Sequence, residues 1–191
     1  MSELVFLLEE ESAKAMLAGL LPKIIPNGIE VRFLVFEGKQ DMEKQLVRKV
    51  RAYRNEAARF VVLRDQDANQ DCKAVKAKLT SLCTGAGRPD ALIRIACREL
   101  ESFYLADLAA AEQGLGLSGL VRHQGNQKYR RPDYLGSPCK ELEGLTKGQY
   151  QKVGGSRAIG PRLDPENGRS DSFRNLVSGI RSVAAELATW K

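Results

Sequence analysis

The chain has 191 residues, 43% of them hydrophobic and 28% charged, and its formal net charge is +6. This composition excludes a disordered chain and supplies enough apolar residues for one core with an appendage. The four cysteines are scattered and form no CxxC pair, so neither a zinc site nor a disulfide framework is expected. The first apolar run is too short for a signal peptide or a membrane span. We therefore expect a cytoplasmic protein with no membrane partner.

Apolar patterning predicts alternating strands and helices through the first 108 residues. Four short apolar runs, at 4–8, 30–36, 59–63 and 91–97, indicate strands. Each is followed by apolar residues at helical spacing, at 12–21, 41–53, 71–82 and 99–108. Ser12, Asp41 and Asp71 are candidate N-caps of the first three helices. Strands that alternate with helices of this length predict an α/β fold with a mostly parallel sheet flanked by helices.

Residues 113–168 break this pattern, because glycine, proline, lysine and arginine replace most of the apolar residues. We expect a loop-rich arm there. Regularity returns between Phe173 and Leu187, where apolar residues share one helical face that Ser170 or Asp171 would cap. We therefore divide the chain into an α/β core over 1–112 and a basic extension over 113–191. Its closing helix is expected to pack on the core, within a single compact domain.

The positive charge belongs to the last third of the chain. Residues 1–120 contain 17 lysines and arginines against 17 acidic residues, whereas residues 121–191 contain 13 against 7. A polyanion such as DNA or RNA would be drawn to this basic third through phosphate neutralisation and counterion release. The alternative is that these lysines and arginines only solvate a helical surface.

Two acidic clusters stand where apolar strands should end. Glu9 and Glu10 follow the first strand, and Asp65 and Asp67 follow the third. Ligands of open α/β sheets bind at the carboxyl ends of the strands, and hard cations such as Mg²⁺ prefer oxygen ligands. We therefore expect a site for Mg²⁺, or for Mn²⁺, at this edge of the sheet. The alternatives are an acidic helix start stabilised by the helix dipole, and a polar turn over 65–69 with Asp71 as a helix cap.

Basic residues that could contact phosphate lie near these motifs and in the C-terminal third. Lys152 and Arg157 flank two glycines, but no GxxxxGK[ST] motif is present. Basic residues and tyrosines interleave around Arg130 and Arg131, a pattern typical of nucleic-acid contacts, with an ordinary solvated loop as the alternative. The chain has one histidine, so a histidine-based catalytic triad is not expected. The candidate phosphate or nucleic-acid contacts are Arg64, Arg130, Arg131, Lys152 and Arg157.

The order strand, glutamate, helix, strand, helix, strand, Asp-x-Asp resembles the Rossmann-like Toprim domain of topoisomerases, primases and overcoming-lysogenization-defect nucleases. More narrowly, the chain resembles the DUF4276 family. Four segments show this resemblance: Leu-Leu-Glu9-Glu-Glu-Ser12, Asp65-Gln-Asp67, Arg94 through Tyr104, and Tyr150-Gln-Lys152 through Phe173. Members of that family are described as Toprim-like and often neighbour ATPases in presumed phage-defence loci. The resemblance implies that Glu9, Asp65 and Asp67 bind Mg²⁺.

The first motif departs from the Toprim pattern, which is usually Glu-Gly-x-Ser/Thr. Alignment on Ser12 makes Glu9 the equivalent glutamate and places Glu10 where glycine is expected. We favour Glu9 as the ligand and keep Glu10 as the alternative. Glu99 and Glu101 begin the fourth predicted helix and could assist catalysis. In a helix they point roughly 200° apart, so only one of them is expected at the site.

These patterns lead to one main functional hypothesis and two alternatives. The main hypothesis is an Mg²⁺-dependent Toprim-like nuclease or phosphoryl-transfer protein that acts on nucleic acid, with phage defence as one setting for that activity. The first alternative is a non-catalytic or regulatory subunit that works with a separate ATPase. The second is a phosphoryl-transfer enzyme with small substrates, which would show no salt-dependent binding of DNA or RNA.

Overall fold

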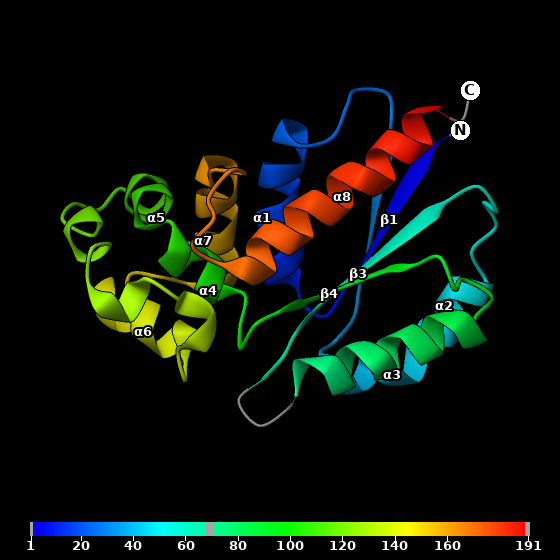
Figure 1. Cartoon of the computed structure of the whole chain (residues 1–191), viewed down its shortest axis with the longest axis horizontal. Helices are drawn as coiled ribbons and strands as arrows, with labels where there is room; N and C mark the ends of the chain where they lie inside the picture. The colour runs from blue at the N-terminus through cyan, green and yellow to red at the C-terminus, as the bar shows by residue number, and fades with distance from the viewer. Residues whose placement is uncertain (1, 68–70, 190–191) are drawn as a thin grey trace.

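Four parallel strands form the sheet at the centre of the molecule (Figure 1). In the computed structural model, which describes residues 2–67 and 71–189, their order is β2-β1-β3-β4. The strands are β1 (Glu3–Leu8), β2 (Glu30–Val35), β3 (Arg59–Asp65) and β4 (Leu92–Ala96). The predicted α/β fold with a mostly parallel sheet is confirmed. The strand order reverses between β1 and β3, which is where ligands bind in open α/β sheets.

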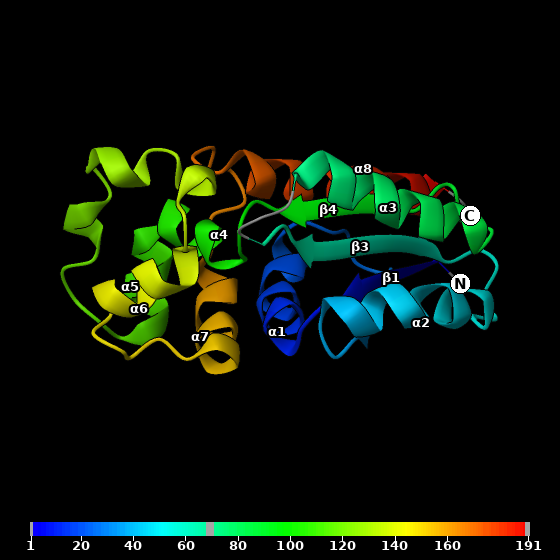
Figure 2. The same ribbon diagram turned by 90° about the horizontal axis from the view of Figure 1, so that it is seen from below.

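Helices cover both faces of this sheet (Figure 2). Helices α2 (Lys39–Arg51) and α3 (Cys72–Gly85) cover one face, and α1 (Glu11–Leu20) and α8 (Asp171–Thr189) cover the other. Alternate residues of β1 enter two separate hydrophobic clusters, with Val5 on the α2 side and Phe6 on the α1 side. Both faces of β1 are therefore buried, as the uninterrupted apolar run of this strand requires.

Two of the candidate helix caps are confirmed and two are not. Asp71 caps α3 by accepting a hydrogen bond from the backbone N–H of Lys73, and the Ser170 hydroxyl accepts one from Phe173 at the start of α8. Helix α1 instead begins at Glu11, so Ser12 already lies inside it. Helix α2 begins at Lys39 after Gly38, and Asp41 accepts from the Glu37 N–H within the first turn. The polar turn expected through Ala68 and Asn69 lies outside the described residues.

The expected loop-rich arm also contains short helices, which with α4 form a helical lobe beside α1 (Figure 1). The α-helices of this lobe are α4 (Glu101–Ala106), α5 (Leu108–Leu115), α6 (Pro138–Leu145) and α7 (Lys152–Ile159). Helices α6 and α7 have only eight residues each, too few to show a clear periodicity, and α7 also contains two glycines, which disfavour a helix. The shorter 3₁₀ helices are η1 (Leu21–Lys23), η2 (Val121–His123), η3 (Gln127–Tyr129), η4 (Pro132–Tyr134) and η5 (Gly160–Arg162). Among the described residues, no helix is long and apolar enough to cross a membrane.

Helix α7 packs closely against α1, one of the helices that cover the sheet. A Cβ atom at Gly160 would come within 2.4 Å of the Met16 carbonyl oxygen, and one at Gly19 would meet the Pro161 ring. Only glycine allows such an approach of two backbones. This packing places the first residue of α7, Lys152, beside the end of β1.

Candidate functional site

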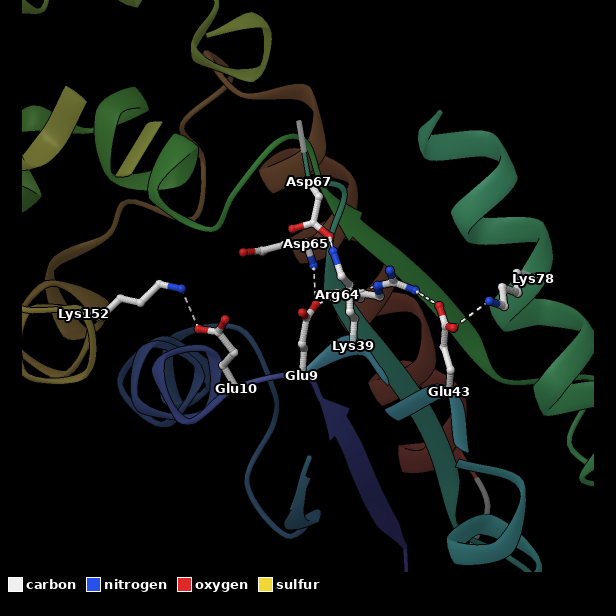
Figure 3. A network of polar contacts seen from close by, with 9 residues as sticks. All are labelled: Glu9, Glu10, Lys39, Glu43, Arg64, Asp65, Asp67, Lys78 and Lys152. Carbon is white, nitrogen blue, oxygen red and sulfur yellow. Dashed lines mark hydrogen bonds and ion pairs between the residues drawn. The ribbon is translucent and has the colours of Figure 1, made fainter. Parts of the chain in front are cut away.

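The acidic residues at the carboxyl ends of β1 and β3 meet where the strand order reverses (Figure 3). Because β1 and β3 are paired in parallel, with Leu8 opposite Leu63, the chain leaves both strands at the same edge. Glu9 then accepts a hydrogen bond of 3.2 Å from the backbone N–H of Asp65. Two residues that are 56 positions apart in the sequence thus form one site.

Asp65 interacts electrostatically with three other carboxylates. Burial raises its pKa well above the usual range, and the negative charges of Glu101, Glu9 and Glu10 raise it further, opposed by Lys152. The pKa of Glu9 is also raised, first by burial, although Arg64 and the Asp65 N–H oppose this shift. A group of like charges in a poorly hydrated place favours any added cation.

Glu101 joins this group from the first turn of α4, and its side chain has no exposed surface. Its Oε1 accepts a hydrogen bond of 2.8 Å from the Tyr150 hydroxyl. Its Oε2 is buried and has no hydrogen-bond partner among the described residues, and the same holds for the Tyr104 hydroxyl. Glu99 instead accepts from the Cys139 N–H at 2.7 Å. The two glutamates have different surroundings, and Glu101 is the one near the other carboxylates. The helix expected from Glu99 begins at Glu101, so the reason is not helical spacing but the separate contacts of Glu99 with Cys139 and of Glu101 with Tyr150.

Basic side chains of the chain itself balance the acidic group. Lys152 lies 2.7 Å from Glu10, Lys39 lies 2.8 Å from Asp67, and the Arg64 Nε lies 3.8 Å from Glu9. Burial alone would lower the pKa of Lys152, but its hydrogen bond and charge interaction with Glu10 raise it above the ordinary value. Lys152 belongs to the helical lobe, so this ion pair connects the lobe to the edge of the sheet.

Asp67 lies at the side of the cluster rather than within it. Its backbone has φ of 65°, in the left-handed region, and its N–H donates to the Arg98 carbonyl at 3.0 Å. Arg98 has the same φ of 65°. Two hydrogen-bonded non-glycine residues in this region indicate a backbone held in an uncommon conformation, a feature that clusters at functional sites.

The carboxylate oxygens of these acidic residues are chemically suited to a hard cation, although the side chains do not converge on one point. Within residues 2–67 and 71–189, no three acidic, histidine or cysteine side chains converge closely enough to hold a metal ion. The available oxygens are nevertheless those that Mg²⁺ prefers together with water. The unpartnered Glu101 Oε2 and the raised pKa values of Glu9 and Asp65 indicate a cluster short of positive charge. Its members are Glu9, Glu10, Asp65 and Glu101, which we call the acidic cluster.

A comparison with protein-family models gives a match over residues 8–181, to the family described as a domain of unknown function, DUF4276. The chain belongs to the DUF4276 family. No curated protein and no solved structure matches it. The description of DUF4276 assigns no activity, so the function of this member is inferred from its site.

In this DUF4276 protein, the basic residues predicted to contact phosphate lie in three different places. Arg64 is 1% exposed, and its Nη1 donates to Glu43 at 2.7 Å. Lys152 and Arg157 are exposed residues of α7. Arg130 and Arg131 are exposed in the helical lobe, where Arg131 lies 5.8 Å from the ring centre of Tyr134. The acidic cluster therefore has Arg64 and Lys152 near it, whereas the arginines around Tyr134 belong to another surface.

Sequence reasoning missed Lys39, Tyr150 and the pair Glu43–Lys78. Lys39 directly follows Gly38, just after the end of β2. Because polar residues at the carboxyl ends of strands are candidates for a site, the reasoning that identified Glu9 and Asp65 also applies to Lys39. Tyr150 shows no such signal, because its contact with Glu101 spans 49 residues. The same is true of Glu43, whose bond to Lys78 joins two helices separated by β3.

Proposed function

We propose that this DUF4276 protein hydrolyses or transfers phosphodiester groups of nucleic acid with the help of a divalent cation, Mg²⁺ or Mn²⁺. The observation that supports the proposal is the position of Asp65 at the end of β3. There its carboxylate is poorly hydrated and faces the like charges of Glu9, Glu10 and Glu101. A carboxylate with a strongly raised pKa at a strand-order reversal is typical of a group that receives a cation or a proton in function.

The side chains of the acidic cluster have distinct tasks under this proposal. Glu9 and Asp65 would hold the cation, with Glu10 and Asp67 as further ligands once Lys152 and Lys39 release them. Glu101, fixed by Tyr150, would orient the ligands or the attacking water through its unpartnered oxygen. A bound divalent cation lowers the pKa of water and offsets charge on a scissile phosphate. The released lysines, with Arg157, would contact the phosphate.

The proposal is tested by titrating Mg²⁺ and Mn²⁺ into the wild type and the Asp65→Asn/Asp67→Asn variant by calorimetry, followed by cleavage assays on DNA and RNA. The variant should bind the cation about tenfold or more weakly, because affinity follows the charge of the ligands, and should lose cleavage. The control is Asp171→Asn, which changes an exposed carboxylate of α8 and should behave as wild type. Cleavage that persists in the double variant would contradict the proposed roles.

One observation favours a second candidate, a non-catalytic or regulatory subunit that works with a separate ATPase. The basic side chains of the chain already pair with Glu9, Glu10 and Asp67, as a structural network would. The sequence has no P-loop motif, so any ATP-driven step would need another protein. Copurification with an ATPase, together with cation binding but no cleavage by the isolated chain, would support this candidate over the first.

A further inference from the structure

A pocket of about 410 Å³ opens between the first turns of α2 and α3, on the other side of Arg64 from the acidic cluster. Figure 3 shows Arg64 extending away from Lys152, toward Glu43 and Lys78. Three basic side chains line the pocket, together with the amide of Gln40. The full lining is Lys39, Gln40, Glu43, Arg64, Asp71, Ala74, Val75 and Lys78.

Arg64 is the feature of this pocket that needs an explanation. Its side chain is 1% exposed, yet only Nη1 has a hydrogen-bond partner, and Nε and Nη2 have none among the described residues. A buried guanidinium with two unused donors is costly unless a ligand or a rearrangement satisfies them. The contact of Nε with Glu9, at 3.8 Å, is too long for a hydrogen bond.

Glu43 shows what kind of ligand the pocket accepts. One of its carboxylate oxygens accepts from Arg64 at 2.7 Å and the other accepts from Lys78 at 2.6 Å. Burial would raise the pKa of Glu43, but these two cations lower it below the ordinary value. An anion with several oxygens is therefore bridged between two basic residues, which is the arrangement that also binds phosphate.

We propose that this pocket binds a phosphate group, which Arg64, Lys78 and Lys39 hold in competition with the Glu43 carboxylate. The phosphate comes from a nucleic-acid strand or from a free mononucleotide. Both present negatively charged phosphate oxygens, as a monoanion in the strand and as a monoanion or dianion in the mononucleotide. The first turns of α2 and α3 add favourable dipoles on the same side. The inference rests on the proposed function only for the source of the phosphate.

The test measures the binding of inorganic phosphate by NMR titration, without divalent cations, to the wild type and three variants. Lys78→Gln should weaken binding by about tenfold, the value of one charge-assisted hydrogen bond, and Glu43→Gln should strengthen it because the internal competitor loses its charge. Lys44→Gln, an exposed lysine of α2 outside the pocket lining, should bind as wild type does. Thermal melting confirms that each variant is folded.

Equal affinity of the wild type and Lys78→Gln, or weaker binding by Glu43→Gln, would overturn the proposal. The two sources are then separated with a nucleoside monophosphate and a short single-stranded oligonucleotide. If Lys78→Gln binds the oligonucleotide more weakly than the wild type does, the pocket holds a phosphate of a strand. If only the binding of the monophosphate is weaker, the pocket holds a free nucleotide. Because this measurement involves neither Asp65 nor a divalent cation, it tests the phosphate pocket independently of the proposed hydrolysis.

Discussion

At the residue scale, the acidic cluster places stability and function in opposition. The pKa of Asp65 is raised because its carboxylate is poorly hydrated, although the residue keeps some exposed surface, and because three other carboxylates lie near it. Without a cation, its ionised form therefore destabilises the folded protein at neutral pH. Functional sites often contain such groups, and their removal stabilises the fold while it abolishes activity.

We predict that Asp65→Asn, measured without divalent cations, has a higher Tm than the wild type. A gain of about 1 kcal/mol corresponds to about 2–4 °C in a chain of this size. Asp67→Asn is the matched control, because Asp67 only forms a half-exposed ion pair with Lys39 and should change Tm little. Calorimetry in EDTA measures both. A lower Tm for Asp65→Asn would show that the carboxylate stabilises the fold, contrary to the prediction.

The buried carboxylate of Glu3 shows the reverse behaviour at the opposite end of the sheet. Its side chain is 6% exposed and accepts hydrogen bonds from Tyr53, Asn55 and Arg32 at 2.7, 2.7 and 2.8 Å. Burial would raise its pKa, but these bonds and the charge of Arg32 lower it. Since the folded pKa lies below the unfolded one, the stability that Glu3 provides is present above the unfolded pKa and is lost as pH falls through the folded pKa.

We therefore predict that Glu3→Gln lowers the free energy of unfolding at pH 7 by about 1–3 kcal/mol, the usual cost of weakening hydrogen bonds to a buried charge. The difference from wild type should shrink below about pH 4, where the unfolded-state carboxylate takes up a proton. Urea unfolding at several pH values measures this, with Glu186→Gln, which changes an exposed side chain of α8, as the control. A difference that does not change with pH would mean that packing rather than charge is lost.

At the element scale, the contact of α7 with α1 decides where Lys152 lies. Gly160 approaches the backbone of Met16 too closely for any side chain, whereas a Cβ atom at Gly154 would meet nothing nearer than Gln151, at 4.0 Å. Gly154 is a residue of α7, and Gly160 directly follows that helix. A comparison of substitutions at these two glycines therefore distinguishes the loss of close packing from the general effect of glycine on a helix.

We predict that Gly160→Ala lowers the free energy of unfolding by about 1–3 kcal/mol, the usual cost of overpacking. Gly154→Ala should be neutral or stabilising by up to about 1 kcal/mol, because alanine reduces the entropy of the unfolded chain. Because the first change shifts α7 and with it Lys152, it should also alter the affinity of the proposed cation site for Mg²⁺. Chemical unfolding and metal titration of both variants provide the measurement. Equal stability of the two variants would mean that α7 can move without cost.

At the scale of the whole molecule, the charge is divided between the two parts of the chain. The surplus of six positive charges comes from residues 121–191, which include the exposed Arg130 and Arg131 beside the 72% exposed Tyr134. An exposed ring with an arginine at 5.8 Å offers both stacking and phosphate contact to a nucleic acid. This surface would bind the strand outside the acidic cluster.

If it does, Arg130→Ala/Arg131→Ala should weaken the binding of single-stranded DNA or RNA without sequence preference. The slope of log K against log[salt] should fall by about 0.7 for each phosphate that the variant no longer neutralises. The control is Arg174→Ala/Arg181→Ala, from the same basic third of the chain, where each arginine already pairs with an acidic residue. Fluorescence anisotropy at several salt concentrations measures the slopes. An unchanged slope in the first variant would place the strand elsewhere.

The predicted fold and part of the site depended on local information and could be obtained from the sequence. Apolar runs mark the strands, and parallel pairing then brings the residues at the ends of β1 and β3 to one edge, so Glu9 and Asp65 meet as expected. The helical spacing of Glu99 and Glu101 predicted that only one of them lies at the site, but Glu99 precedes α4, so this argument does not apply in the structure. The sequence could not show that Glu101 is the one near Asp65, because that depends on the contact with Tyr150.

What the sequence alone determined is therefore the alternation of strands and helices, the position of carboxylates at strand ends and the basic character of the last third. The tertiary structure decided the strand order, the burial of Arg64 beneath Glu43, and the pairing of Lys39 and Lys152 with the acidic residues. The physical reason is the range of the interactions. Patterning and capping act within a few residues, whereas ion pairs and close backbone packing join residues far apart in the chain, as Glu10 and Lys152 are.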